Sequence, residues 1–533
     1  MAERTCASCG AVVTATAVTC SACGKPLPGG EASSGSRLPP PHSARQPGWA
    51  PSSEAPWPPA GFRAAPASKS TKWPFLLAGV IVVAALVAGG LVWANRDNGP
   101  SHPSAWDPRV APIANWVAKH RGLEYKQPVF VDFLTPAQYT KRAGGGNEGT
   151  GGASASKKQQ QDELDRQLAE LRAFGLVEGK VDLKKADTDL NDSGTLAYYS
   201  PQEERIFVRG TSMTPGLKVT LAHELTHVLQ DQHFDLKRLD KLPSTQRTAL
   251  RSLAEGDARR IEHLYVKSLS SADRKSYQDA EAKESKDALN KLDKSVPPAL
   301  IALFGAPYDF GTEFVDLLDH QGGNTEIDKA FEKPPKSDEQ LFDPFTYLDH
   351  DDPRDVKAPP VPKGTKHLDE ESVGATLWYL ILATRMDPKV ALAAADGWGG
   401  DRYVEYQRKS TVCIVDQLKG DTAKDTDEMG KALAELPEKL VSVKRQGDAL
   451  IATFCDPGQN HELGIPNVAT QVIGLPVLRS QISISALTQG ATRKQSQCYG
   501  EALVNRLDVA QLTGSSVTPE VKQAVADARR LCI

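Results

Sequence analysis

The sequence lacks an excess of charge of either sign. Its 63 Lys and Arg residues nearly balance its 67 Asp and Glu residues, which leaves a formal net charge of −4. Without a strong overall field there is no electrostatic reason to expect nucleic acid as a partner. Internal repeats are also absent. The length of 533 residues exceeds that of one small domain, so we expect about two to four domains.

Charged residues are likewise absent from residues 73–94, which read WPFLLAGVIVVAALVAGGLVWA. A helix of ~20 apolar residues just crosses a hydrocarbon core of ~30 Å. The alternative is a cleaved signal peptide, but the segment before the apolar stretch is much longer than in ordinary signals. We therefore predict a single-pass protein of the cell membrane. A slight excess of basic residues before the span favours a cytoplasmic N-terminus and an extracytoplasmic remainder.

Cysteine does not occur between residues 24 and 412, so the eight cysteines form two groups. The first group consists of two Cys-x-x-Cys pairs, whose thiolates suit a tetrahedral structural zinc ion: Cys6, Cys9, Cys20 and Cys23. Two disulfides are the alternative for these four. In the second group, we predict the disulfides Cys413–Cys455 and Cys498–Cys532 among the possible connectivities. Zinc-bound thiolates suit a reducing cytoplasm, and disulfides suit an oxidising exterior. The two groups of cysteines therefore also predict a cytoplasmic N-terminus and an extracytoplasmic C-terminal part.

The fold class that we predict is α+β and mainly helical, with a small sheet. Residues 28–72 are rich in Pro, Ser, Ala and Gly and have no apolar period, which is typical of a disordered tether. Residues 195–210 predict a β-hairpin with a turn at Ser200-Pro201. The predicted segments are a zinc ribbon (1–27), the tether (28–72), a transmembrane helix (73–94), a catalytic domain (105–420) and a disulfide-containing α+β region (421–533).

One helical segment, TLAHELTHVLQDQ at 220–232, carries two histidines four residues apart. Residues at this spacing share a helix face, so His223 and His227 can bind one metal ion while Glu224 lies beside them. Neutral imidazole suits Zn²⁺, and an adjacent carboxylate can take a proton from zinc-bound water. The leucine stripe of this helix lies roughly opposite the histidines. This argues against core histidines and leaves a solvated surface pair as the alternative.

A catalytic zinc ion needs a third protein ligand, with the fourth position left for water. The helical segment at 249–266 offers Glu255, which lies off its apolar stripe. Asp257, Glu262 and His263 are the alternatives. Because an unbonded carboxylate within an apolar stripe is costly, Asp257 is also a candidate to orient a ligand histidine. The preceding hairpin would place a strand edge near the site, where an extended peptide can pair.

The motif HELTHVLQDQ followed by LAEGDA resembles a bacterial family of neutral zinc metallopeptidases, whose ligand plan is similar to that of the gluzincins. The likeness covers about residues 116–420 and includes APYDFGTEFV (306–315), PPKSDEQLFDP (334–344) and DGWGGDRYVEY (396–406). It implies a zincin-like catalytic domain. The roles that it implies are zinc ligands at His223, His227 and Glu255 and a general base at Glu224.

Two residues depart from the family pattern. Asp338 and Asp343 stand where Thr and His are usual, which puts in doubt any role of their segment but not the zinc site. Two further residues, Tyr308 and His233, are candidates to stabilise an oxyanion. The zinc ribbon, the tether and the disulfide-containing region lie outside the resemblance.

The sequence thus predicts a membrane-anchored zinc metallopeptidase with one catalytic and one structural zinc ion. Zinc would polarise the scissile carbonyl, and Glu224 would carry a proton from water to the leaving amine. Expected partners are a peptide or protein substrate, the lipid bilayer and a cytoplasmic protein that binds the ribbon. The alternatives are an inactive binding or scaffold protein and a signalling protein. The intact Glu224 disfavours the first, and the long tether disfavours tight coupling in the second.

Overall fold

The computed structural model describes residues 3–5, 12–14, 101–144, 157–192, 196–461, 464, 469–514 and 517–533. The chain divides into two compact units, residues 1–62 and 63–533. In the first unit, β1 (Glu3–Thr5) and β2 (Val12–Thr14) pair as antiparallel strands. Several predicted features lie outside the described residues: the tether, the apolar stretch at 73–94, and the ribbon cysteines Cys6, Cys9, Cys20 and Cys23.

The structure corrects the prediction of a membrane protein. Within the part of the chain that it describes, no helix is both long enough and apolar enough to cross a membrane. The long described helices carry charge along their length, as in α6 (Ser244–Ser268), which reads STQRTALRSLAEGDARRIEHLYVKS. We therefore withdraw the single-pass topology, the bilayer as a partner and the localisation derived from them.

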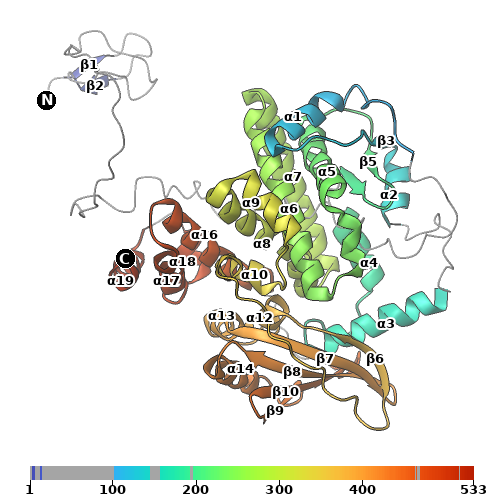
Figure 1. Ribbon diagram of the computed structural model, residues 1–533, viewed down its shortest axis with the longest axis vertical. Helices are drawn as coiled ribbons and strands as arrows, with labels where there is room; N and C mark the ends of the chain where they lie inside the picture. The colour runs from blue at the N-terminus through green and yellow to red at the C-terminus, as the bar shows by residue number, and fades with distance from the viewer. Residues whose placement is uncertain are drawn as a thin grey trace. The chain divides into compact units, whose positions relative to one another are not determined.

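The described part of the second unit is α+β and mainly helical, with two sheets (Figure 1). The smaller sheet has the order β3-β5-β4. Its strand β3 (Phe130–Leu134) runs parallel to β5 (Arg205–Arg209), whereas β4 (Ala197–Ser200) runs antiparallel to β5. The predicted hairpin at 195–210 is confirmed, and β4 is an edge strand of the sheet.

The helix α5 (Pro215–Phe234) packs against this edge strand. It begins where the Thr214 hydroxyl accepts a hydrogen bond from the Leu217 amide, with Pro215 in the first turn. From residue 221 to residue 230 every side chain is buried, because β4, α1 (Ala111–Arg121), α6 and α7 (Ser271–Ser295) all pack on this helix. The histidines opposite the leucine stripe are therefore buried as well, which excludes the alternative of a solvated histidine pair.

The helices α6 and α8 (Pro298–Gly322) pack closely because each has a glycine at their contact. A Cβ atom on Gly256 would lie 2.0 Å from the carbonyl oxygen of Gly311, and one on Gly311 would lie 2.0 Å from the carbonyl oxygen of Ser252. Only glycine allows the two backbones to touch. The other helices of this region are α2 (Pro136–Gly144), α3 (Lys157–Ala173), α4 (Leu183–Asp192), the 3₁₀ helix η2 (Leu236–Lys241), α9 (Asn324–Glu332), α10 (Glu339–Phe342) and α11 (Pro344–Asp349).

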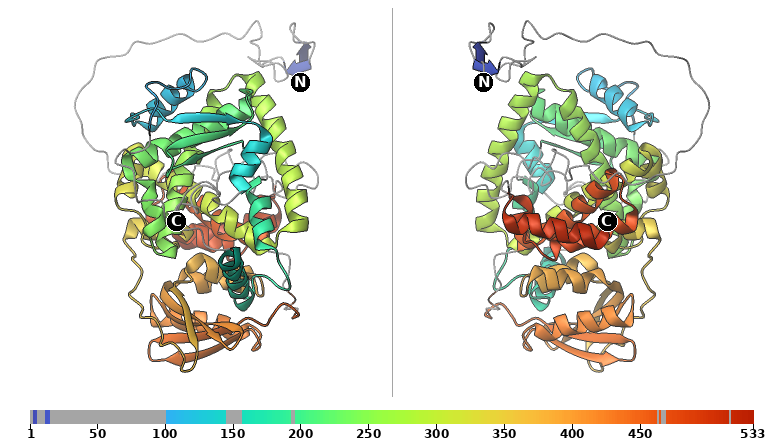
Figure 2. Two further views of the ribbon diagram at one scale, coloured as in Figure 1. Left: turned by 90° about the vertical axis from the view of Figure 1, so that its right-hand side faces the viewer. Right: turned by 90° about the vertical axis from the view of Figure 1, so that its left-hand side faces the viewer.

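The larger sheet is antiparallel, with the order β6-β7-β8-β10-β9. Its strands and neighbouring helices are β6 (Lys366–Glu371), α12 (Ala375–Ala383), α13 (Pro388–Asp396), β7 (Trp398–Arg408), β8 (Thr411–Gly420), α14 (Ala423–Glu435), β9 (Val441–Gln446) and β10 (Ala449–Cys455). The sheet joins strands from both sides of residue 420, where we placed a segment boundary. Figures 1 and 2 show the two sheets at opposite ends of this unit, with α6 and α8 between them.

Asp338 and Asp343 have local structural roles. Asp338 accepts hydrogen bonds from the backbone amides of Ala375 and Thr376, at 3.3 and 3.0 Å, and so caps the first turn of α12. Asp343 caps α11 by accepting from the Phe345 amide at 3.0 Å. Both carboxylates thus satisfy amides that a helix start leaves unpaired.

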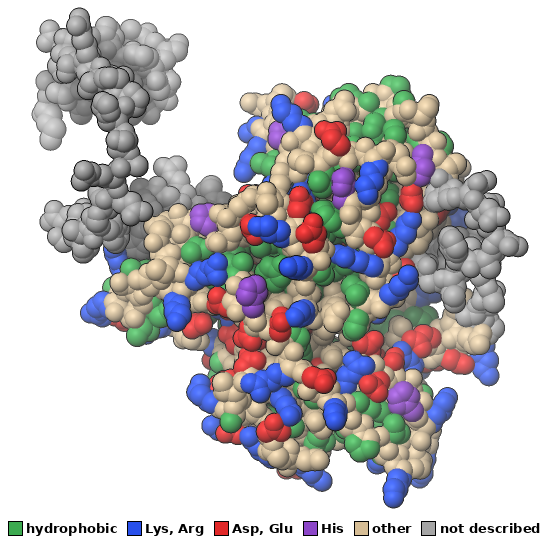
Figure 3. Space-filling model, viewed as in Figure 1, with side chains coloured by type: hydrophobic (Ala, Val, Ile, Leu, Met, Phe, Trp, Pro, Cys, Tyr) green, Lys and Arg blue, Asp and Glu red, His purple; other side chains and the backbone are tan. Residues whose placement is uncertain are grey.

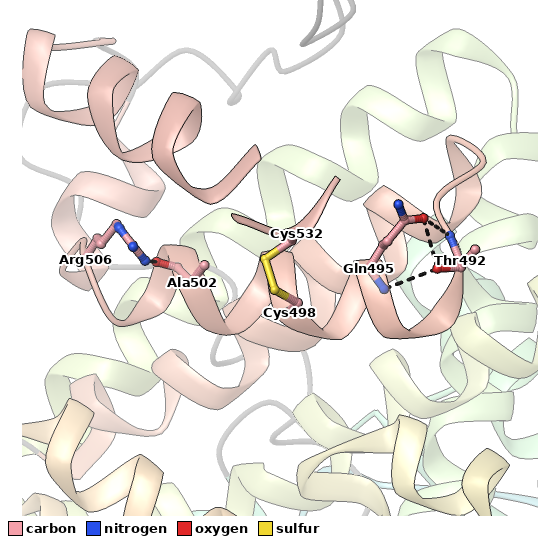
Figure 4. The surroundings of a disulfide bond; sticks show 6 residues. All are labelled: Thr492, Gln495, Cys498, Ala502, Arg506 and Cys532. Atoms are coloured by element: carbon pink, nitrogen blue, oxygen red, sulfur yellow. Dashed lines mark hydrogen bonds between the residues drawn. A yellow bond between two sulfur atoms is a disulfide. The ribbon is translucent and has the colours of Figure 1, made fainter. Parts of the chain in front are cut away.

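Both predicted disulfides are present. Cys413 and Cys455 are register partners on β8 and β10 and form the first bond. The second, Cys498–Cys532, joins α17 to α19 (Figure 4). The C-terminal helices are α15 (Ala469–Val472), α16 (Gly474–Thr488), α17 (Arg493–Val504), α18 (Val509–Thr513) and α19 (Pro519–Cys532). On the face drawn in Figure 3, side chains of both charge signs are interspersed, in keeping with the balanced composition.

The close contact of α6 and α8 predicts different outcomes for two glycines of the same helix. We expect Gly311→Ala to lower the free energy of unfolding by about 2 kcal/mol or more, because its methyl group overlaps the Ser252 carbonyl. In the control Gly305→Ala, the new Cβ meets its nearest atom at 3.7 Å. This variant should be neutral or gain about 0.5–1 kcal/mol from helix propensity. Thermal melts of the two variants check this, and equal melting temperatures would contradict it.

Candidate metal centre

Three side chains from α5 and α6 converge on one point. The Nε2 atoms of His223 and His227 lie 3.1 Å apart, and Oε2 of Glu255 lies 3.3 and 3.5 Å from them. Ligand atoms placed tetrahedrally at ~2.0–2.1 Å from zinc are about 3.4 Å apart. Among the described residues, these three form the one group of His, Cys, Asp or Glu side chains close enough to hold a metal ion. The structure thus brings together the three predicted ligands.

Neighbouring side chains determine which nitrogen of each imidazole carries the proton. The amide nitrogen of Gln230 donates to the Ala254 carbonyl and to Asp257, both at 3.0 Å, so its oxygen faces His227. That oxygen, Oε1, lies 2.8 Å from Nδ1 of His227, which must therefore be the donor. Nδ1 of His223 lies 3.0 Å from a carboxylate oxygen of Glu262 and donates to it. In the neutral rings, both Nε2 lone pairs are then directed toward the point of convergence.

The electrostatics of the cluster favour a cation. Glu255 is fully buried, and neither of its carboxylate oxygens has a hydrogen-bond partner. Burial raises the pKa of Glu255, but the opposing effect of His227 and His223 is larger and lowers it well below its usual range. Burial also opposes a charge on His223, yet Glu255 and Glu262 raise its pKa to about 10. The lowered pKa of Glu255 and the raised pKa of His223 both reflect the attraction between the carboxylates and positive charge at this point.

The donor set fits a metal ion better than it fits a proton. A proton on His223 can be shared with only one neighbour, whereas a divalent cation can bind both imidazoles and the carboxylate at once. Two imidazole nitrogens and one carboxylate oxygen are ligands that Zn²⁺ accepts in three-ligand sites. The residues present therefore fit the zinc ion that the sequence predicts.

Glu224 lies beside the cluster and is fully buried. Its Oε2 accepts a hydrogen bond from the backbone amide of Tyr199 at 2.8 Å, while its Oε1 has no partner among the described residues. Burial is the main cause that raises the pKa of Glu224 to about 7, against the lowering effect of His223 and His227. A carboxyl group that titrates near neutral pH can both accept and release a proton.

The alternative ligands have other positions. Asp257 accepts from Gln230 and, at 2.7 Å, from Nε of Arg121, so it orients His227 through Gln230 rather than facing the point of convergence. Glu262 contacts the outer nitrogen of His223. His263 is not part of the cluster. Both Asp257 and Glu262 thus hold a histidine in place.

The two candidates for oxyanion stabilisation differ in position. The hydroxyl of Tyr308 is buried and has no hydrogen-bond partner within the described part of the chain. Burial and then the carboxylates of Glu255 and Glu224 raise the pKa of Tyr308, so the hydroxyl lies near both of them. His233 instead directs Nε2 to the Glu124 carbonyl at 2.8 Å, near the end of α5. Only Tyr308 borders the metal cluster.

Two residues that contribute to the site, Gln230 and Tyr199, were not predicted from the sequence. Gln230 stands three residues after His227, a spacing at which helix side chains meet. The contact between the two side chains could therefore have been predicted from the sequence. The backbone amide of Tyr199 reaches Glu224 across 25 residues, and no local pattern indicates such a contact.

Comparison with known protein families gives a match for one part of the chain. Residues 363–457 match the family described as a domain of unknown function (DUF8575). The match covers the five-stranded sheet with α12, α13 and α14, and it includes none of the residues of the metal cluster. Searches of curated proteins and of solved structures found no match.

The contacts around the histidines predict a graded loss of zinc affinity. We expect His227→Ala to lose one zinc ion per chain, the one at this cluster, since it removes a ligand. Gln230→Ala should weaken the affinity by about 10- to 100-fold, the usual effect of removing a group that orients a ligand. Gln232→Ala is the matched control, because this glutamine of the same helix bonds Lys126 and Gln127 instead. Competition with a chelator measures the affinities, and wild-type affinity in Gln230→Ala would refute this role.

Proposed function

We propose that this chain is a zinc-dependent peptidase with a zincin-like catalytic domain, in which His223, His227 and Glu255 bind zinc and Glu224 is the general base. The observation that carries the proposal is the convergence of three acceptor atoms next to a buried carboxyl group with one free oxygen. A purely structural metal site has no use for such a carboxyl group. Hydrolysis requires it.

The roles of the side chains follow from their contacts. A bound zinc ion supplies a Lewis acid that polarises the scissile carbonyl and acidifies the attacking water. Oε1 of Glu224, which has no partner among the residues that the structure describes, accepts the proton of that water and returns it to the leaving amine. The Tyr199 amide holds the other oxygen of Glu224 and so fixes the plane of the carboxyl group. The hydroxyl of Tyr308 is free to donate to the oxyanion.

The position of β4 supports a peptide as the substrate. The Tyr199 amide donates to Glu224 and not to β5, so it lies on the free edge of this strand, toward α5. An extended peptide can add to such an edge through main-chain hydrogen bonds, and its scissile bond would then lie beside Glu224. The edge strand and the metal cluster thus belong to one site.

A structural zinc ion in the N-terminal segment is a separate proposal. Paired Cys-x-x-Cys spacing supports it, and the short strands β1 and β2 lie next to and between the two pairs. The ligands that we propose are Cys6, Cys9, Cys20 and Cys23. Zinc content of a variant with serine at these positions, measured beside the wild type, would decide it: an unchanged content would contradict the proposal.

The general base gives the sharpest test of catalysis. Glu224→Gln is nearly isosteric but cannot accept a proton, so turnover of a peptide library should fall by at least ~10²–10⁴-fold. Zinc content should remain, because Glu224 is not a ligand in this proposal. Glu332→Gln, on the exposed side of α9, is the control and should keep full activity.

Two results would contradict the enzyme proposal. One is equal cleavage by the wild type and Glu224→Gln, which would indicate a contaminating protease. The other is a zinc-loaded wild type that cleaves no member of a broad library, as an inactive binding protein would.

A further inference from the structure

An arginine with two unpaired nitrogens, Arg251, lies one turn before Glu255 on α6. The Nε and Nη2 atoms of Arg251 are inaccessible to solvent and make no hydrogen bond within the described residues. The neighbouring Arg121 and Arg260 each leave one nitrogen unpaired as well, but both form ion pairs with Asp257. Leaving donors of a charged group buried and unpaired is costly. Within the described part of the chain, no carboxylate pairs with these two nitrogens of Arg251.

Arg251 is placed beside the candidate active site. Residues four apart share a helix face, so Arg251 and Glu255 lie on the same side of α6, about 6 Å apart along the helix axis. The positive charge of Arg251 also lowers the pKa of Tyr308, which burial, Glu255 and Glu224 together raise well above its usual value. The guanidinium, the phenol and the metal ligands are thus neighbours.

The two unpaired nitrogens indicate what the partner is. Nε and Nη2 lie on one side of the guanidinium, and their N–H bonds are parallel. This pair matches the two oxygens of a carboxylate, and bidentate binding of this kind is a reason for arginine rather than lysine at such sites. The hydroxyl of Tyr308, also unpaired, is a further donor nearby.

We propose that Arg251 binds a carboxylate of the peptide substrate close to the scissile bond. The inference rests on the proposed peptidase function and specifies its substrate class. Arg251 and Glu255 are about 6 Å apart along the axis of α6. An extended peptide advances ~3.3–3.6 Å per residue, so this separation corresponds to roughly two residues of the substrate. The carboxylate is then either the C-terminus of a peptide cut near its end, or the side chain of an Asp or Glu near the scissile bond.

The inference is tested by measuring peptide binding to the zinc-loaded full chain that carries Glu224→Gln. This variant should bind peptides without cleaving them. The probes are peptides that differ only at one carboxylate: a free or amidated C-terminus, and Asp or Glu against Asn or Gln within two residues of the cleaved bond. We expect the carboxylate form of one of these pairs to bind roughly 10- to 100-fold more tightly, as for a hydrogen bond to a charged group. The pair that shows the difference identifies the source of the carboxylate.

Two double variants, each with a second substitution added to Glu224→Gln, show whether Arg251 is responsible for the preference. Adding Arg251→Gln should remove the preference for the carboxylate, whereas adding Arg247→Gln should keep it. Arg247 lies one turn earlier on the same face, but it is exposed and donates to the Leu242 carbonyl. If Arg251→Gln melts at a lower temperature than its parent, Arg251→Lys takes its place. This variant keeps the charge but loses the paired donors, so the preference should shrink.

The outcomes separate this inference from the proposed function. Cleavage by the wild type with no carboxylate preference in any pair overturns the role of Arg251 alone. A preference that survives Arg251→Gln overturns it as well. A carboxylate preference that depends on Arg251, in a chain whose wild type cleaves nothing, supports the carboxylate site and overturns the peptidase. Failure to bind any of the peptides overturns both.

Discussion

Two imidazole nitrogens and a carboxylate oxygen meet within 3.5 Å of one another in the interior of the protein, where water cannot screen them. The side chains of His223 and His227 are 4% and 5% exposed, and that of Glu255 is fully buried. Three acceptors in such a place repel one another unless positive charge lies among them. The surrounding structure holds this arrangement in place, and a metal ion at the point of convergence would make it favourable.

The supporting contacts reach the cluster from three helices. Arg121 of α1 pairs with Asp257 of α6, which holds Gln230 of α5, and Gln230 in turn orients His227. A buried ion pair such as Arg121–Asp257 is weak evidence for stability, because desolvation offsets much of the attraction. Its geometric effect is clearer, since it holds the imidazole in the tautomer that a metal requires.

Three consecutive residues of α6 divide these tasks among them. Successive residues of a helix point about 100° apart, so Glu255, Gly256 and Asp257 face three different neighbours. Glu255 faces the histidines of α5, Gly256 touches the backbone of α8, and Asp257 meets Arg121 of α1. The rotation of α6 about its axis is thereby fixed from several sides. A larger residue at 256 would displace α8 and with it Tyr308, which borders the cluster.

Regular spacing made part of this structure predictable from the sequence. The i,i+4 histidines and the hairpin before them are local or alternating patterns, and the structure contains them. The two disulfides, which close separations of 42 and 34 residues, were predicted from the strands and helices that carry the cysteines. The burial of α5 was not predictable, because one apolar stripe says nothing about what covers the opposite face. Helical spacing favoured Glu255 over Asp257 and Glu262, because it lies off the apolar stripe, but spacing did not give the contacts of the three carboxylates. Their roles depend on the rotation of α6, which the distant Gly311 helps to set.

The buried atoms that remain unpaired around the cluster are of complementary kinds. Glu224 offers a free acceptor, whereas Tyr308 and Arg251 offer free donors. A peptide bond under hydrolysis presents the matching groups, because water must lose a proton while the carbonyl oxygen gains negative charge. The Tyr199 amide adds a constraint, since its hydrogen bond to Glu224 uses an edge donor that an incoming peptide would also need. If a peptide took that donor, Glu224 would lose a bond that stabilises its ionised form and would become a stronger base.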